Sequence, residues 1–182
     1  MVNYSLKLGW KPLLTDIDLS KNKISAPGCM SAALIEEVLD SQTDNLTYKA
    51  ITYFHGGSPD NLIITPDLFN TQVNQLANAC DLKIQNDLNQ FKEENQVEDS
   101  EQFSTQQQMQ NDLISPVFPQ MYASGIFIDS FSPKDEMQTN CMVNAIKAFK
   151  CNIVIVVDDK RLELSIKDKL KSSDSETLVL FI

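Results

Sequence analysis

Basic side chains are scarce in this sequence, and arginine is nearly missing. The 182 residues include 15 lysines and arginines against 25 aspartates and glutamates, which gives a net charge of −10, and Arg161 is the single arginine. Binding to a nucleic-acid backbone relies on clustered lysine and arginine, and two-point contacts to phosphate rely on arginine. Nonspecific binding to nucleic acid is therefore not expected, and we expect no DNA ligand.

Glycine-rich and histidine-based motifs are lacking as well. None of the five glycines is followed by lysine and then serine or threonine, and no G-x-G-x-x-G occurs, so the sequence shows neither a phosphate-binding loop nor a dinucleotide fingerprint. His55 is the only histidine, and the four cysteines include no C-x-x-C pair. We therefore expect no zinc site and no hydrolase triad, and we predict a structural role for His55.

Long apolar runs are absent too, and no secretory signal is present at the start, so we expect no contact with a membrane. The hydrophobic content of 42% is high enough for one sizeable core, which predicts one domain over residues 1–182. Residues 92–121 are rich in glutamine, glutamate, asparagine and serine. We predict a low-complexity, disordered insertion there, because these residues bury too little apolar area to offset their ordering entropy.

Apolar runs alternate with helical patterns, which predicts an α/β fold. Residues 123–129, 152–157 and 177–182 are typical of buried strands, and apolar side chains recur at helical spacing between them. Strands that are separated by helices pair in parallel through right-handed crossovers. We therefore predict a mostly parallel sheet with helices on both faces.

Two further elements are predicted upstream of these. Residues 50–54 have the β-branched and aromatic content of a buried strand. Thr65 and Pro66 are typical of a helix start, and apolar residues recur at helical spacing from Phe69 to Cys80. This helix either continues past Asp81 or restarts there.

Two carboxylates close the first apolar run of the chain. Asp16 and Asp18 are two positions apart, so on a strand they would share a face and could jointly hold Mg²⁺. Alternatively, both begin a polar turn. Asp129 and the Asp158–Asp159 pair follow other predicted strands, so three acidic strand ends could form a cation pocket, although helix capping accounts for Asp158 and Asp159 equally well.

The order of segments resembles the RNA 5′-hydroxyl polynucleotide kinase family, which includes the kinase-like subunit of the pre-mRNA cleavage and polyadenylation machinery. The likeness begins at residues 3–28, NYSLKLGWKPLLTDIDLSKNKISAPG, and returns at ITYFHGGSPDN, ASGIFIDSF and AIKAFKCNIVIVVDDKRLELSIKDKL. Residues in register with the family motif are Asn3, Tyr4, Gly9, Pro12, Asp18, Pro27 and Gly28.

The resemblance implies a central P-loop kinase-like domain whose N-terminal strand and phosphate loop would precede Met1. It implies that Asp18 is the catalytic carboxylate, assisting Mg²⁺ and the attacking 5′-hydroxyl during phosphoryl transfer from ATP. An arginine-bearing lid would follow Ile182. Because phosphoryl transfer depends on positioning and charge neutralisation, we expect this polypeptide to be inactive alone and to bind no cofactor by itself.

Several positions depart from the family pattern. Lys21 stands where the family has glutamine, and Pro133 stands where it has the tryptophan of its substrate-clasping loop. A platform for stacking single-stranded bases needs an aromatic ring, and Phe131 is the nearest substitute. Phe131, Pro133 and Lys134 are therefore the candidate clasp residues.

These departures favour a scaffold over an active kinase. The first hypothesis is a piece of a nuclear, ATP-binding factor of pre-mRNA 3′-end cleavage and polyadenylation, with other subunits of that machinery as partners and RNA as a candidate ligand. The alternative is an active polynucleotide 5′-hydroxyl kinase that uses ATP and Mg²⁺. A second alternative is an acidic receiver-like domain, in which Asp16, Asp18 and a phosphoacceptor converge on one metal.

Overall fold

The computed structural model describes residues 1–39, 49–56, 65–101, 125–171 and 177–182, with side chains given outside 91–101. It is an α/β structure, as predicted. The elements in chain order are α1 (Val2–Lys7), β1 (Leu13–Asp16), β2 (Cys29–Leu34), β3 (Ala50–Phe54), α2 (Pro66–Glu101), β4 (Ile126–Asp129), α3 (Glu136–Ala148), β5 (Ile153–Val156), α4 (Lys160–Lys171) and β6 (Leu178–Phe181).

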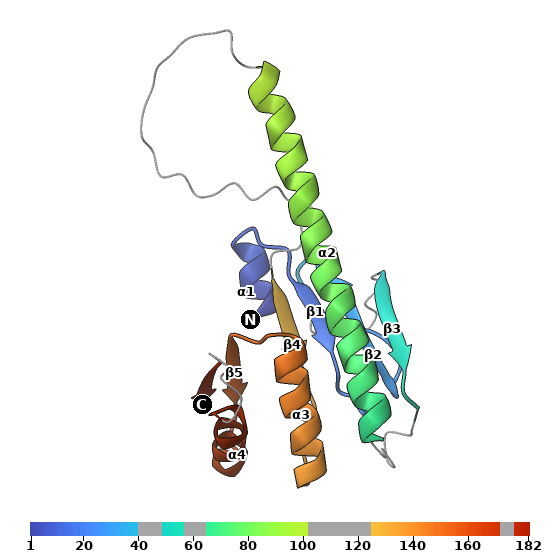
Figure 1. The fold of residues 1–182 in the computed structure, drawn as a ribbon, viewed down its shortest axis with the longest axis vertical. Coiled ribbons are helices and arrows are strands. Elements are labelled where there is room, and N and C mark those ends of the chain that lie inside the picture. Colours follow the sequence, from blue (N-terminus) through green and yellow to red (C-terminus); the bar gives the residue numbers. More distant parts are fainter. Residues whose placement is uncertain (40–48, 57–64, 102–124, 172–176) are drawn as a thin grey trace.

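The larger sheet has four strands in the order β3-β2-β1-β4 and is mixed (Figure 1). β1 pairs with β4 in parallel, whereas β2 is antiparallel to both β1 and β3. The prediction of a mostly parallel sheet is therefore partly wrong. The reason is the connection: β1 reaches β2 through a loop without a helix, residues 17–28, and such a short return favours antiparallel pairing.

Helices cover both faces of this sheet. One face packs against α2 and α3 and forms the main core, which includes Met30, Phe69, Leu76 and Cys141. On the other face, Leu14 and its neighbours contact the short helix α1. No described helix is long and apolar enough to span a membrane.

The last two strands form a separate parallel pair, β5 with β6, rather than extending the larger sheet. Helix α4 packs on this pair, and a second core joins it to α3 through Val143, Ile146, Val156, Ile166 and Val179. Helix α3 contributes to both cores, so it is the element that connects the two sheets.

Strands β4 and β5 each leave one edge unpaired within the described residues. Leu13 and Ile17 donate N–H groups to the carbonyls of Gly125 and Asp129, so the main-chain groups of Ile126 and Ile128 point away from β1. The carbonyls of Asn152 and Val156 likewise accept from Leu178 and Ile182, so the main-chain groups of Ile153 and Ile155 point away from β6. A hollow of about 410 Å³ lies beside this edge, lined by residues of α1 and β4 and by Asn152.

Of the two elements predicted between residues 50 and 80, the helix forms as expected and the strand is less buried than expected. Strand β3 forms with the expected bounds but is largely exposed at the sheet edge, so its prediction as a buried strand is wrong. The helix predicted from Pro66 is confirmed, and it continues without restarting to Glu101. Residues 92–101 are thus helical, although they belong to the segment predicted to be a disordered insertion; residues 102–121 lie outside the described part.

Candidate functional site

The acidic pair lies where β1 ends, but only one of the two residues belongs to the strand. β1 ends at Asp16, which is in register with Ser31 on β2 and with Asp129 on β4. Asp18 lies in the following loop, so the prediction that both carboxylates share a strand face is wrong. Ligands of open α/β sheets bind at the carboxyl ends of the strands, and this edge is therefore the candidate site.

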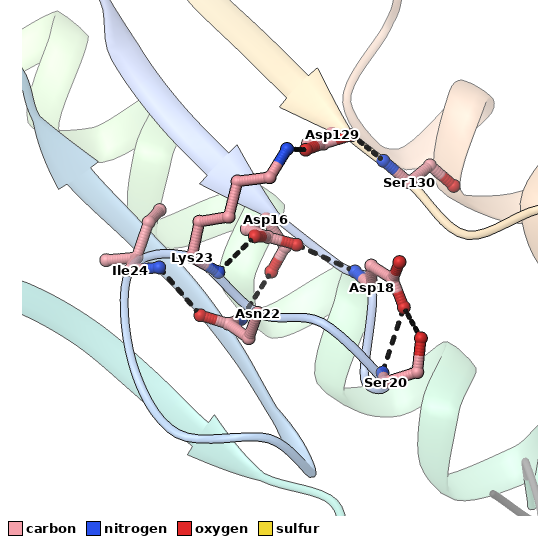
Figure 2. Close-up of polar contacts among 8 residues, drawn as sticks. All are labelled: Asp16, Asp18, Ser20, Asn22, Lys23, Ile24, Asp129 and Ser130. Atoms are coloured by element: carbon pink, nitrogen blue, oxygen red, sulfur yellow. Dashed lines mark hydrogen bonds and ion pairs between the residues drawn. The ribbon is translucent and has the colours of Figure 1, made fainter. Parts of the chain in front are cut away.

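Asp16 is turned inward and forms main-chain hydrogen bonds (Figure 2). Only 1% of the residue is exposed. Its Oδ1 accepts from the N–H of Asp18 at 2.9 Å, and its Oδ2 accepts from the N–H of Lys23 at 2.7 Å. The alternative prediction of a turn residue is correct in its geometry, since the side chain closes the loop. The turn is buried rather than solvated.

Burial changes the proton affinity of this carboxyl group. The pKa of Asp16 is raised from 3.8 to about 6, mainly by desolvation. The N–H groups of Lys23 and Asp18 oppose this rise, and the nearby carboxylates of Asp129 and Asp18 add to it. The Lys23 ammonium pairs with Asp129 at 2.6 Å, and this hydrogen bond raises the pKa of Lys23. Lys23 thus neutralises part of the negative charge at this strand edge.

Asn22 is the second buried side chain of this loop, with 9% of the residue exposed. Its Nδ2 donates to the main-chain oxygens of Asp16 and Cys29, at 3.3 and 3.0 Å. Its Oδ1 accepts from the N–H groups of Ile24 and Ser25, at 3.0 and 2.6 Å. One amide therefore ties the loop to both flanking strands.

Asp18 is partly buried and holds a tight local turn. Its Oδ1 accepts from both the N–H and the hydroxyl of Ser20, at 2.9 and 2.6 Å. Within the described residues, no hydrogen bond is recorded for its Oδ2. The Asp18 carboxylate therefore has one oxygen that can receive a ligand.

These contacts decide which residue fits a magnesium ion. Asp16 is 1% exposed and each of its oxygens accepts a main-chain N–H group, so it is less open to a metal ion than Asp18. Its predicted metal role and the receiver-like alternative stay predictions. Asp18 fits as one ligand, directly or through water. Across the described segments, no three His, Cys, Asp or Glu side chains are grouped so that they could hold a metal ion. The remaining ligands would have to come from elsewhere.

The candidate clasp is not a base-stacking surface. Phe131 is 8% exposed and packs edge-to-face on Phe69, with ring centroids 5.6 Å apart. The prediction that Phe131 replaces the family's aromatic platform is therefore wrong, because its ring belongs to the core. Pro133 is partly buried and Lys134 is exposed.

The residues after Pro133 build the start of helix α3. Asp135 is the N-cap, and its Oδ1 accepts from the N–H of Gln138 at 2.7 Å. The side-chain oxygen of Gln138 in turn accepts from the N–H of Lys134 at 2.8 Å. This reciprocal pair resembles a capping box and gives this loop a structural role.

Replacing Asp135 with alanine is expected to lower the free energy of unfolding by about 1 kcal/mol, because the N–H of Gln138 loses its side-chain acceptor. Urea unfolding followed by circular dichroism measures the change. The matched control is Lys134→Ala, which keeps the main-chain N–H that contacts Gln138. Equal stabilities of the two variants would contradict the capping role.

His55 has the structural role predicted for it. Its Nδ1 lies 2.9 Å from Oε1 of Gln72, and its Nε2 accepts from the N–H of Thr65 at 3.4 Å. Gln72 also donates to the carbonyl oxygen of Phe54. The histidine therefore connects the end of β3 to the start of α2. Capping is likewise confirmed for Asp159, whose Oδ1 accepts from the N–H groups of Arg161 and Leu162.

Sequence reasoning missed Asn22 and Lys23 because neither belongs to a recognised chemical motif. It also gave no role to Asn3, although the residue is in the family motif. The Asn3 amide exchanges two hydrogen bonds, each 2.8 Å long, with the main chain of Leu39. Its position therefore reflects the attachment of α1 to the segment after β2.

The sheet is covered by helices, and acidic residues lie at the carboxyl ends of its two parallel strands. These features define an open α/β domain, a class that binds ligands at the carboxyl edge of the sheet. The family described as mRNA cleavage and polyadenylation factor CLP1 P-loop matches residues 1–97. The chain belongs to this family.

Similar proteins agree with this assignment. The chain is 21% identical to a protein CLP1 homolog of Arabidopsis thaliana, with 98% of this chain and 33% of the relative covered. It is 34% identical over 83 residues to a polyribonucleotide 5′-hydroxyl-kinase Clp1 of Danio rerio, with 43% and 17% covered. The chain spans about a third of the length of the relatives that it matches almost throughout.

A solved structure shares the fold. The structure of a wild-type Clp1p–Pcf11p complex matches with a TM-score of 0.65 and 19% identity, and the match covers 98% of this chain and 38% of that chain. At this identity the likeness shows a shared fold.

Proposed function

We propose that the protein containing this chain acts in the nucleus as an ATP-binding scaffold subunit of the pre-mRNA 3′-end cleavage and polyadenylation machinery. Membership of the CLP1 family supports this role in mRNA 3′-end processing. The observation that favours a scaffold over a kinase is the burial of Phe131 in the core. A single strand of RNA then has no aromatic ring to stack on at the loop where the family resemblance implies its grip.

In this proposal ATP and Mg²⁺ stabilise the intact protein. Mg²⁺ supplies positive charge beside the ATP phosphates when it is bound. This chain contributes the Asp18 carboxylate, which would contact the ion or one of its waters. Because Oδ1 is held by Ser20, the other oxygen faces the ligand without losing a hydrogen bond.

The proposed partners are other subunits of the same machinery. One solved relative is a complex of Clp1p with Pcf11p, which supports binding to a protein partner of that kind. RNA remains a candidate ligand, contacted through those partners rather than through a basic surface, because the chain carries a net charge of −10.

The test uses a tagged version of the complete protein, expressed in nuclei of its own organism. Immunoprecipitation followed by mass spectrometry is expected to recover subunits of the 3′-end processing machinery, and depletion is expected to lower cleavage at polyadenylation sites. Equilibrium binding is expected to show Mg²⁺-dependent binding of ATP that is weakened by Asp18→Ala. Failure to recover any processing subunit would contradict the scaffold proposal.

ATP binding also requires a phosphate loop outside these residues. We expect transcript sequence on the 5′ side of the Met1 codon to encode G-x-x-x-x-G-K-[ST]. If the extended reading frame lacked this motif, the ATP-binding part of the proposal would fail, while the scaffold part would not depend on it.

The alternative is an active polynucleotide 5′-hydroxyl kinase. The observation that favours it is the partly exposed Asp18 carboxylate in the loop after β1, together with the kinase name of the Danio rerio relative. In that case the complete protein transfers phosphate from ATP to a 5′-hydroxyl RNA oligonucleotide, and Asp18→Ala lowers the rate by about 10²–10⁴-fold. ATP binding without transfer supports the scaffold instead.

A further inference from the structure

The loop between β1 and β2, residues 17–28, is held from inside by two buried polar side chains. Asp16 precedes the loop and Asn22 lies in its middle, and both are at least nine-tenths buried. Their polar atoms contact main-chain groups of the loop and of the strands beside it, rather than solvent. The conformation of the loop is therefore set by these two side chains.

We propose that Asp16 and Asn22 are positioning residues, which fix the loop before any ligand binds so that the Asp18 carboxylate is already in place. This inference rests on the proposed function, in which Asp18 faces Mg²⁺ and ATP. It gives Asp16 a role other than the metal ligand that its spacing from Asp18 suggests.

The chemistry of Asp16 suits this role because a carboxylate only accepts hydrogen bonds. Its two oxygens receive two main-chain N–H groups, one from Asp18 and one from Lys23. A single side chain thus fixes the loop at both the ligand-facing residue and the residue where the chain turns back. An asparagine in its place would turn an NH₂ group toward one of these N–H donors and lose that bond.

Asn22 complements Asp16 because it needs both halves of an amide. Its NH₂ group donates to two carbonyls, those of Asp16 and Cys29, and its oxygen accepts from Ile24 and Ser25. An aspartate there would place negative charge against two carbonyl oxygens. Position 16 therefore requires a side chain that only accepts hydrogen bonds, and position 22 requires one that both donates and accepts. In a solvated polar loop, either position could hold any polar residue.

Hydroxyl groups extend this network across the sheet. Ser25 contacts Asn22 and the hydroxyl of Ser31 on β2, and Ser31 contacts the hydroxyl of Thr52 on β3. The loop is consequently attached to β1, β2 and β3 and cannot shift without breaking several buried hydrogen bonds. A preformed loop does not have to be ordered at the moment of binding, which increases affinity.

The buried carboxylate of Asp16 allows a variant that separates a positioning role in the loop from a general contribution to the stability of the fold. An ionised carboxylate that is only 1% exposed is costly to remove from water, even when two main-chain N–H groups bind it. The isosteric variant Asp16→Asn removes that cost and loses one hydrogen bond, so the two effects on global stability oppose each other. The loop alone should loosen, whereas a purely structural residue would affect the whole fold.

The test is hydrogen exchange on the complete protein, comparing residues 17–28 with the core segment 69–80 of α2. Asp16→Asn is expected to speed exchange of the loop amides by about tenfold or more relative to the α2 amides, whose exchange follows the global stability. Asn22→Ala should act in the same direction. Lys23→Met is the matched control, because it removes the ammonium and keeps the main-chain N–H bound to Asp16.

Binding of Mg²⁺ and ATP to the same variants completes the test. If only the ordered loop binds the ligand, the affinity of a variant for ATP falls in proportion to the fraction of molecules in which its loop is ordered. The amount of ATP bound at saturation is unchanged. Unchanged loop exchange in Asp16→Asn, or equal acceleration in loop and core, would overturn the inference. If wild type binds no ATP, the ATP-binding part of the proposed function fails, and the exchange data alone decide whether the two residues order the loop.

Discussion

Replacing Phe69 with alanine is expected to lower the free energy of unfolding by about 3–5 kcal/mol. The side chain is fully buried near the start of α2. It makes edge-to-face contacts with Phe131 on one side and with His55 on the other, with ring centroids 5.6 and 6.1 Å apart. The truncation therefore leaves a cavity where α2, β3 and the segment after β4 meet. Such a loss is a large part of the stability of an ordinary domain.

Urea unfolding monitored by far-ultraviolet circular dichroism measures this effect. The neighbouring variant Leu68→Ala removes a similar apolar side chain that is 43% exposed, and it serves as the control. Its effect should stay below about 1 kcal/mol. A loss at Phe69 no larger than that at Leu68 would show that α2 does not pack on the sheet as described.

The second large effect is a pH dependence of stability that comes from Asp16. Its pKa in the folded protein is raised from 3.8 to about 6 by burial. The folded state therefore binds this proton more tightly than the unfolded state. The resulting stability is present in full below pH 3.8 and is lost as the pH rises through about 6. The whole change is about 3 kcal/mol, of which about 2 kcal/mol falls between pH 4.5 and 7.5.

The measurement compares wild type with Asp16→Asn, in which this titration is removed. The difference in unfolding free energy between the two proteins should change by about 2 kcal/mol from pH 4.5 to 7.5, in favour of the variant. Asp67→Asn, at an exposed aspartate in the first turn of α2, controls for the loss of one negative charge. A difference that does not vary with pH would mean that Asp16 is not buried as a carboxylate.

Local patterns predicted the helices and most strand positions. The stripe from Phe69 to Cys80 identified α2 because apolar side chains every three or four residues must face one surface. Direction and pairing of the strands depend on the connections. The return from β1 to β2 contains no helix, and this fact, rather than the composition of either strand, makes the sheet mixed.

Burial at the edge of the sheet was also beyond a local pattern. Residues 50–54 have the composition of an interior strand, yet β3 has only β2 as a described neighbour and is largely exposed. The candidate aromatic at Phe131 failed for the opposite reason. Its ring is taken up by Phe69, a residue 62 positions earlier in the chain, and no spacing rule connects them.

At the candidate site, the spacing of the two acids did not predict how differently the structure places them. Asp16 and Asp18 look equivalent in the sequence, since both lie two positions apart at the end of the same apolar run. They differ because β1 ends at Asp16, so one carboxylate turns into the loop and the other stays partly exposed. Asn22 could be recognised only once the carbonyls that it contacts had been brought together.

The unpaired edges of β4 and β5 have a consequence for handling the protein. A row of main-chain donors and acceptors without partners is a template for strands of other molecules, and β5 and β6 add exposed apolar side chains at Ile153, Leu178 and Phe181. A parallel pair of four-residue strands is also too small to persist alone. The isolated chain should therefore associate as its concentration rises. Its kinetics should change from first-order folding at low concentration to second-order assembly at high concentration. A dilute preparation kept cold is best suited to obtaining the monomer.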